Sequence, residues 1–403
     1  MKRYPQEKFD AIIIGGGACG LMCAVQAGLR GKRTLVLERN DRPGAKILIS
    51  GGGRCNYTNL HSAPANFVSA NPDFARAAFS RWTVEDTVTF FERHGIIGRE
   101  KVLGQLFPVS NRAKDVVLVF TKLMRQYGQE LYLHSRAVSV DRLPKGGFGV
   151  LYEQEGAERY AVADAVVMAS GGLPVAKLGA SDFALRIARS YGLEVVPTAP
   201  ALVPLTITGK DAAWFAALSG NTVFSRVYNE RINFEENILF THWGLSGPAI
   251  LQISSYWRPG ETITIDLLPR HSVAELIRQE REAGGRRLVS QLLHEFFSRK
   301  LVEALGGLLP LTVKVASLGK ADAKRIAEGI HRFTVKPAGD KGYDKAEVMR
   351  GGVATHELDP QTLEARKVPG LYFGGECVDM TGWLGGYNFQ WAWSSGYVIA
   401  QAI

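Results

Sequence analysis

The sequence is poor in cysteine, and the few cysteines it has form none of the familiar reactive or metal-binding spacings. Four cysteines occur among 403 residues, at positions 19, 23, 55 and 377, and no Cys-x-x-Cys pair is present. Disulfide reductase chemistry is therefore disfavoured, and no zinc site is predicted. Cys19 and Cys23 lie four residues apart in a predicted helix and share one face, where we expect both to be buried.

Long apolar segments are also missing. The first residues, MKRYPQEKFD, contain no apolar core of a secretory signal, and no uncharged apolar stretch of about 18 residues follows. We therefore expect neither a signal peptide nor a membrane span, and a cytoplasmic protein. A hydrophobic content of 46% and a charged content of 22% are typical of a globular protein, and 403 residues predict two or three domains.

Clustered positive charge is missing as well, although the formal net charge is +9. Lysine and arginine are scattered among acids, and no run of five or more basic residues occurs. This pattern predicts a basic solvated surface that favours anionic substrates. A nucleic-acid-associated protein is the least favoured interpretation of the charge.

Residues 9–38 carry the strongest motif of the chain. An apolar run predicts a buried parallel strand, and Gly15-x-Gly17-x-x-Gly20 follows it directly. In such a strand, turn and helix, the first glycine makes the tight turn, the second lets the backbone approach a pyrophosphate, and the third lets the helix pack closely. Glu38 follows a second predicted strand, at the spacing of an acid that binds ribose hydroxyls. FAD or NAD is therefore favoured over NADP.

A glycine-rich segment at 39–59 is the next candidate for cofactor contacts. It contains Lys46 and then Ser50-Gly51-Gly52-Gly53-Arg54-Cys55-Asn56. Glycines let the backbone come close to a ligand, and Lys46, Arg54 and Asn56 offer donors to phosphates or to the edge of a flavin. We predict a ligand-binding loop here, with a plain surface loop as the alternative.

The middle of the chain alternates between strand and turn patterns. Short alternating segments at 130–134, 138–142, 148–153 and 159–163 predict a small β-meander. A separate apolar strand at 165–169 leads into Ser170-Gly171-Gly172, a turn that we expect beneath the cofactor.

After residue 197 the composition shifts, because prolines cluster there and β-rich segments follow. His242 lies in this region, within Phe-Thr-His-Trp-Gly-Leu-Ser-Gly-Pro at 240–248. A single histidine is more often structural, and the functional alternative is an acid–base group or a substrate contact.

A second glycine-rich cluster lies near the C-terminus. A strand predicted at 371–373 stops at Gly374-Gly375-Glu376-Cys377-Val378-Asp379, and Gly385-Gly386-Tyr387-Asn388 opens a helix that contains Gln390. The acid and the glycines suit the ribityl chain and pyrophosphate of a long cofactor. A helix N-terminus near the pyrimidine end of a flavin also stabilises the negative charge that develops on reduction. A plain NAD site does not need this second set of contacts.

Together these motifs resemble the bacterial flavoproteins grouped as BaiN-type or YhiN-type FAD-dependent oxidoreductases, a family that includes an aminoacetone oxidase. The matching segments are 15–20, 50–59, 241–248, 375–379 and 385–388, in order along nearly the whole chain. The resemblance implies an α/β fold. A glutathione-reductase-type FAD-binding Rossmann domain at 1–194 and 351–403 is interrupted by a β-rich domain at 195–270 and 333–350, which carries a small helical domain at 271–332.

The resemblance also implies bound FAD, and the sequence predicts no metal site. Arg54 and His242 are our candidates for catalytic groups near the flavin. The expected cofactor contacts are Gly15, Gly17, Ala18, Gly20, Glu38, Arg39, Lys46, Ser50, Gly51, Gly53, Arg54, Cys55, Asn56, Val138, Ser170, Gly171, Gly172, Gly375, Glu376, Asp379, Gly385, Gly386, Tyr387, Asn388 and Gln390.

Three functions are consistent with the sequence. The first is an FAD-dependent oxidoreductase that oxidises a small organic substrate, such as an amine or amino-ketone, and passes electrons to oxygen or another acceptor. The second is an NAD(P)H-dependent flavin reductase of an unsaturated substrate. No second Gly-x-Gly-x-x-Gly occurs, so NAD(P)H would dock only transiently at the flavin. The third is an FAD-containing nucleic-acid-associated protein. The sequence predicts no oligomeric state.

Overall fold

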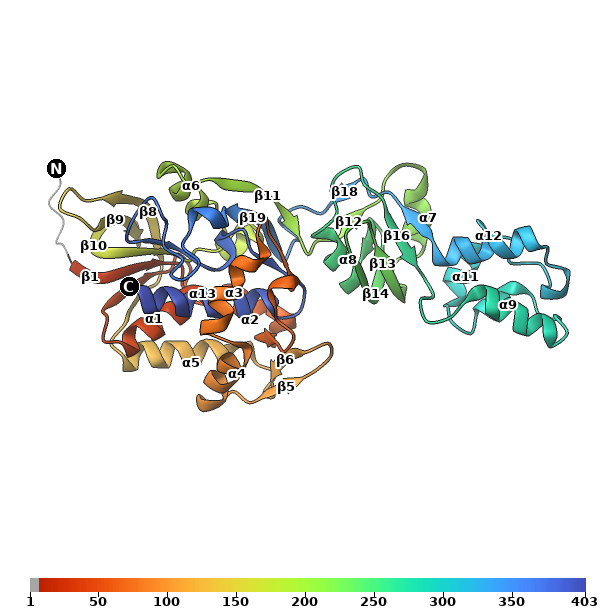
Figure 1. Cartoon of the computed structure of the whole chain (residues 1–403), viewed down its shortest axis with the longest axis horizontal. Coiled ribbons are helices and arrows are strands. Elements are labelled where there is room, and N and C mark those ends of the chain that lie inside the picture. Colours follow the sequence, from red (N-terminus) through yellow and green to blue (C-terminus); the bar gives the residue numbers. More distant parts are fainter. Residues whose placement is uncertain (1–6) are drawn as a thin grey trace. The chain divides into compact units, whose positions relative to one another are not determined.

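The structure, a computed structural model, describes residues 7–403 and contains two compact units (Figure 1). One unit combines the chain up to Ala199 with Val348–Ile403, and the other is Pro200–Glu347. The first unit is thus made from two distant stretches of sequence. This arrangement, with a Rossmann-type sheet in one unit and a second β-rich sheet in the other, confirms the predicted fold class.

The first unit is built on a seven-stranded sheet. Strands β7, β2, β1, β10 and β20 are parallel neighbours in that order, while β9 and β8 continue the sheet from β10 in antiparallel fashion. Residues 11–14 of β1 are at most 4% exposed, as expected for a strand with neighbours on both edges. The strands are β1 (Glu7–Ile14), β2 (Thr34–Leu37), β7 (Glu130–Tyr132), β8 (Ser135–Arg142), β9 (Phe148–Gln154), β10 (Ala157–Met168) and β20 (Leu371–Phe373).

The predicted meander is wrong in two respects. Its first segment forms β7, which pairs in parallel with β2 rather than with the strands of the meander. Its last segment and the apolar strand predicted after it form one continuous strand, β10. Asp164 lies within β10, and its exposed carboxylate forms an ion pair with Lys8 of β1 at 3.3 Å. The remaining β8, β9 and β10 do form consecutive antiparallel pairs.

Helices α1 (Ala18–Leu29) and α13 (Tyr387–Ala402) pack against each other in the first unit (Figure 1). A Cβ on Gly396 of α13 would lie 2.4 Å from the carbonyl oxygen of Cys19, so the two backbones approach more closely than any side chain permits. All four cysteines are buried, as predicted for Cys19 and Cys23. The other helices of this unit are α2 (Ala45–Gly53), α3 (Ala75–Arg81), α4 (Val84–Arg93), α5 (Ala113–Gln126) and α6 (Phe183–Ser190).

Short strands complete the first unit in three small sheets. Those sheets pair β3 (Thr58–Asn59) and β5 (Gly98–Glu100) with β6 (Gln105–Pro108), β4 (Phe67–Val68) with β21 (Thr381–Gly382), and β11 (Val195–Ala201) with β19 (Val348–Val353).

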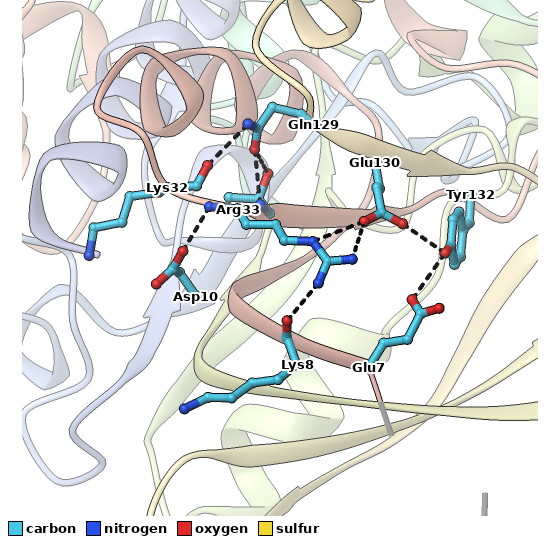
Figure 2. A network of polar contacts seen from close by, with 9 residues as sticks. Glu7, Lys8, Asp10, Lys32, Arg33, Gln129, Glu130 and Tyr132 are labelled. Atoms are coloured by element: carbon cyan, nitrogen blue, oxygen red, sulfur yellow. Dashed lines mark hydrogen bonds and ion pairs between the residues drawn. The ribbon is translucent and has the colours of Figure 1, made fainter. Parts of the chain in front are cut away.

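A polar network joins the amino-terminal ends of the parallel strands (Figure 2). Arg33 binds Glu130 at 2.6 Å, and the Gln129 amide oxygen accepts hydrogen bonds from the Thr34 N–H and hydroxyl. The Arg33 pair is partly exposed and contributes little to stability, whereas the buried amide satisfies backbone groups that would otherwise lack partners. The network thus fixes the end of the sheet where the parallel strands begin. The opposite end, where these strands stop, is left for ligand binding.

The second unit has its own seven-stranded antiparallel sheet, in the order β17-β16-β13-β14-β15-β12-β18. Helices α7 (Ala212–Ala217) and α8 (Pro248–Ser254) pack on it. Its strands are β12 (Leu205–Thr206), β13 (Thr222–Tyr228), β14 (Asn233–Thr241), β15 (Gly244–Ser246), β16 (Ile263–Asp266), β17 (Phe333–Val335) and β18 (Gly339–Asp340).

A group of helices follows β16 and returns to β17 in the second unit (Figure 1). His331, at the end of this group, binds Asp266 of β16 at 2.8 Å and accepts a hydrogen bond from the Val273 N–H. These contacts tie the first and last helices to the sheet. The helices are α9 (Val273–Glu282), α10 (Val289–Leu293), α11 (Arg299–Gly306) and α12 (Lys320–His331). In residues 7–403, no helix has the length and apolar character needed to cross a bilayer.

Candidate functional site: a dinucleotide cradle

The parallel strands of the first unit end side by side, and the chain leaves them through the predicted cofactor residues. The Gly15 N–H donates to Leu37 O at 2.9 Å, so the ends of β1 and β2 are joined. Ala169 N–H donates to Ile14 O, and Gly374 N–H donates to Met168 O, which joins β1, β10 and β20 in the same way. Carboxyl ends of parallel strands are where open α/β sheets bind ligands.

The three fingerprint glycines have different surroundings. A Cβ on Gly15, whose φ is +110°, would lie 2.5 Å from Ala169 O, and one on Gly20 would lie 2.0 Å from Gly15 O. These two glycines are therefore required by packing. Gly17 is different, because no atom lies within 4 Å of a Cβ built there. The space in front of Gly17, at the N-terminus of α1 where Ala18 begins the helix, is open to an anionic ligand.

Glu38 lies beside this helix start and is 7% exposed. Its carboxylate accepts a hydrogen bond from Gly16 N–H at 2.9 Å and another from Asn40 N–H at 2.8 Å. Burial raises the pKa of Glu38, and those two backbone donors partly oppose the increase. The remaining lone pairs of the carboxylate suit the hydroxyls of a ribose.

We expect the FAD affinity to fall toward acid pH because Glu38 takes up a proton. The folded-state pKa lies above the unfolded value, so protonation stabilises the folded apoprotein as the pH falls through the raised pKa. The same proton removes an acceptor for the ribose. Titrating FAD into apoprotein at a series of pH values, while measuring thermal unfolding in parallel, should show these opposite trends.

Glu38→Gln should weaken FAD binding at neutral pH by at least about tenfold, because a charge-assisted hydrogen bond is lost. It should also reduce the dependence of FAD affinity on pH. We expect the remaining pH dependence to come from the buried Asp379, whose pKa is also raised by burial. Asp41→Asn is the matched control, since Asp41 is exposed and its ion pair within residues 7–403 is with the neighbouring Arg42. Unchanged affinity in Glu38→Gln would contradict this role.

The Ser170 turn forms the next part of the cradle with residues from the C-terminal segment. Lys46 Nζ donates to Glu376 Oε2 at 2.5 Å, and Met349 N–H donates to the other oxygen of Glu376 at 3.2 Å. A Cβ on Gly171 would lie 3.6 Å from Glu376 Oε2. Ser170 Oγ is shielded from solvent and has no hydrogen-bond partner among the described residues. Such an orphaned hydroxyl is a feature that a bound ligand would satisfy.

The sequence predicts a loop around Lys46, but Lys46 lies in helix α2. The helix is irregular from Ser50 onward, because the dihedral angles of Ser50, Gly51 and Gly52 leave the helical region and Gly53 has a φ of +81°. The prediction failed because the glycines obscured a short helical turn whose Ile47 is buried. Lys46 therefore reaches Glu376 from a helix rather than from a flexible segment.

Arg54 and Cys55 follow this irregular turn. Arg54 Nε donates to Gly51 O at 2.8 Å, and the guanidinium lies 5.4 Å from the centroid of the Phe107 ring. The Arg54 side chain is exposed, so its other donors face solvent. Cys55 is buried with a φ of +63°, and burial raises the pKa of its thiol to about 12. Cys55 is therefore a neutral packing group rather than a nucleophile.

The turn before α13 closes against the same region. Gly386 has a φ of +101°, and a Cβ there would lie 2.3 Å from Thr58 O, beside Asn56. The Asn388 amide binds the backbone of Gly382 through both its oxygen and its nitrogen. Asp379 is buried and accepts a hydrogen bond from Ala70 N–H at 3.0 Å. These contacts hold the N-terminus of α13 in a fixed position.

Other predicted residues have structural contacts of their own. The fully buried Gln390 accepts a hydrogen bond from Thr58 Oγ1 at 2.6 Å and donates to Ser394, so we expect its amide to hold α13 in place rather than to contact the cofactor. Arg39 is exposed and donates to Gly179 O at 3.2 Å. Val138 lies at a bulge in β8 and is 40% exposed. Tyr387 begins α13 and Gly385 lies in the turn before it, Ser50 and Gly53 lie in the irregular part of α2, Gly172 follows Gly171, and Gly375 begins a short 3-10 helix at Gly375–Cys377.

His242 lies in the second unit, in the turn between β14 and β15. Its ring is 4.0 Å from that of Trp243, and Lys341 Nζ is 5.0 Å from the centroid of the Trp243 ring. The Trp243 indole N–H and the Thr241 hydroxyl are buried and have no hydrogen-bond partner within residues 7–403. Sequence reasoning singled out His242 but missed Trp243 and Lys341, since the lysine is about a hundred residues away and follows no motif.

The cradle fits FAD. Three features lie at the carboxyl ends of the parallel strands: an open anion site at Gly17, a buried acid at Glu38 and a hydroxyl without a partner at Ser170. We expect Asp379 and the start of α13 to supply the second set of contacts that a flavin dinucleotide requires. His, Cys, Asp and Glu residues of the described chain form no cluster of three or more able to hold a metal ion.

Comparison with known proteins supports the same conclusion. The family model described as "HI0933-like protein Rossmann domain" matches residues 9–402. The chain is 43% identical over 398 residues to the ribosomal RNA dihydrouridine synthase of Escherichia coli, covering 98% of both chains. It is 40% identical over 408 residues to the Haemophilus influenzae protein of the same name, covering 100% of this chain and 99% of that one.

Among solved structures, the fold is similar to 3-ketosteroid-Δ4-(5α)-dehydrogenase from Rhodococcus jostii, with a TM-score of 0.50 and 13% identity over 98% of this chain and 97% of the other. That likeness concerns the fold alone. The match to the family model extends over almost the whole chain, and the resemblance to BaiN-type and YhiN-type flavoproteins is confirmed. The chain therefore belongs to the HI0933-like family and is an FAD-dependent oxidoreductase.

Proposed function

We propose that the protein reduces a uracil base of ribosomal RNA to dihydrouracil. The observation that carries this proposal is the 43% identity, over 98% of both chains, to the Escherichia coli enzyme named for that product. The net charge of +9 supports it, since a polyanionic substrate is attracted by a basic surface. The proposal combines two of the sequence-based alternatives, a reductase of an unsaturated substrate and a nucleic-acid-associated flavoprotein, and replaces oxidation of a small amine or amino-ketone.

The reaction saturates the C5=C6 bond of uracil. FAD, when bound and reduced, supplies a hydride, with NAD(P)H as the proposed source of its electrons. C6 is the electrophilic carbon because it is conjugated with the C4 carbonyl. The hydride therefore adds at C6, negative charge develops on the C4 oxygen, and a proton must be delivered to C5. The chain has to supply hydrogen-bond donors for the oxygen and one acid.

The turn at residues 241–243 offers groups of both kinds. The Thr241 hydroxyl and the Trp243 indole N–H are donors without partners in the described chain, and both suit the carbonyl oxygens of uracil. His242 is exposed and is the titratable group of this turn, so we assign it the protonation of C5. Arg54, exposed and held at its base by Gly51, is assigned to a phosphate of the RNA.

The proposal is tested with the purified holoprotein under anaerobic conditions. We expect NADPH or NADH to bleach the flavin absorbance, and ribosomal RNA from a strain lacking this gene to restore it. Mass spectrometry of the digested RNA should find one uridine that has gained two hydrogens. If the flavin bleaches and no RNA, whole or fragmented, gains dihydrouridine, the proposed substrate is wrong. If amines or amino-ketones reduce the flavin instead, the result supports the first function considered from the sequence, oxidation of a small organic substrate.

A further inference from the structure

We propose that a cavity in the second unit is a binding site for one unpaired nucleotide of the RNA substrate. This inference rests on the proposed function for the choice of ligand, and on the geometry of the cavity for its position. The cavity has a volume of about 240 Å³ and lies where three segments of the second unit meet. They are the start of β13, the segment just after β16, and the link between α10 and α11.

Aromatic rings line the cavity from two of these segments. Phe224 comes from β13, and Phe296 comes from the link between the helices; both are half-buried. The His271 ring lies 4.7 Å from that of Phe296. Rings that are partly open to solvent are the platforms on which proteins stack unpaired bases, whatever the base sequence.

Positive charge lies next to the rings. The guanidinium of Arg270 sits 4.0 Å from the centroid of the Phe224 ring, which fixes its orientation. Its one ion pair among the described residues is a long contact of 3.8 Å to Glu235, which also binds Arg226 at 3.1 Å. The fork of Arg270 is thus weakly engaged and suits a phosphate.

Neutral polar groups complete the lining, and none of the residues around the cavity is acidic. Ser298 is the N-cap of α11 and donates to the Asn221 amide oxygen at 2.6 Å. An apolar ligand would gain nothing from this exposed arginine, histidine and serine, and a bare anion would gain nothing from the rings. A nucleotide, with a flat base and a phosphate, uses both.

The test measures binding of a fluorescein-labelled single-stranded RNA to the holoprotein by anisotropy. Phe296→Leu keeps apolar volume but removes the ring, and Arg270→Gln keeps hydrogen-bonding capacity but removes the charge. Each variant should weaken RNA binding roughly tenfold. Arg270→Gln should also reduce the dependence of binding on salt concentration. Arg286→Gln, which removes another exposed charge that lies outside the cavity lining, should have a much smaller effect.

FAD content and bleaching by NAD(P)H should be unchanged in all three variants, which shows that the first unit is intact. Circular dichroism and thermal unfolding equal to those of the wild type show that the second unit, which carries all three substitutions, is folded as well. RNA binding equal to wild type in Phe296→Leu and Arg270→Gln would overturn the proposal. So would an equal loss in Arg286→Gln, because that indicates attraction to overall charge. Uridine monophosphate or inorganic phosphate should compete only weakly; competition as strong as that of RNA would overturn the assignment to a polynucleotide. If wild-type protein binds RNA through this cavity but forms no dihydrouridine, the proposed reaction fails while the site stands.

Discussion

Gly17→Ala should weaken FAD binding by at least about tenfold while leaving the apoprotein folded. The dihedral angles of Gly17, φ −83° and ψ −170°, are accessible to alanine, and no atom lies within 4 Å of the new Cβ. The methyl group instead occupies space in front of the α1 N-terminus, where we expect the pyrophosphate. Replacing glycine by alanine at this N-cap position should cost about 1 kcal/mol of stability at most.

Gly20→Ala is the contrasting variant. Its Cβ would lie 2.0 Å from Gly15 O, so the helix must move away from the strand and the apoprotein itself is destabilised. Flavin content of the purified protein, FAD titration and thermal unfolding of the apoprotein distinguish the two cases. Gly17→Ala protein that retains stoichiometric, tightly bound FAD would show that the pyrophosphate does not lie at Gly17.

His242→Gln should slow formation of dihydrouridine by about a hundredfold to ten-thousandfold, the range for loss of a general acid. Glutamine retains a hydrogen-bond donor and similar size but cannot deliver a proton. Because His242 lies in the second unit, on a turn of its sheet, the substitution should not alter FAD content. The rate at which NAD(P)H bleaches the flavin should also be unchanged.

Anaerobic stopped-flow measurements separate the two halves of the reaction. In His242→Gln, the step in which RNA restores the flavin absorbance should be slow, while the preceding bleaching step is normal. Trp243→Phe keeps the aromatic ring and loses the indole N–H, so it should cause a smaller decrease in the same step, through weaker binding of a uracil carbonyl. If RNA restores the flavin absorbance of the His242→Gln variant at the wild-type rate, another group delivers the proton.

The cofactor half of the site was accessible from the sequence because its requirements are local. A glycine such as Gly15 is demanded by contacts between neighbouring elements of a strand, turn and helix, and so it leaves a short, fixed spacing. The same local signal misled at Lys46, where glycines suggested a loop and a short helical turn forms instead. The long strand β10 was predicted as two segments, at 159–163 and 165–169, because its continuous pairing with β1 involves residues far away in the sequence.

Features of the second unit were less accessible for the same reason. Phe224, Arg270 and Phe296 come from three separate segments, and no spacing in the sequence relates them. Lys341 and Trp243 meet in the same non-local way. The scattered distribution of basic residues also made nucleic acid the least favoured candidate partner, since charges far apart in sequence show no run that marks a common surface.

The interrupted first unit has a consequence for how the protein is made. Strand β20 pairs with residues 166–168 at the end of β10, and Arg30 of the first helix donates to the carbonyl oxygens of Ala400 and Ile403. During translation, β1, β2 and β10 therefore leave the ribosome long before the segments that complete their sheet and pack on α1. The second unit, Pro200–Glu347, is emitted in between as one continuous stretch and has its own core. The inserted unit is therefore complete before the last segments of the first unit emerge, and the FAD cradle is complete only after α13 has left the ribosome.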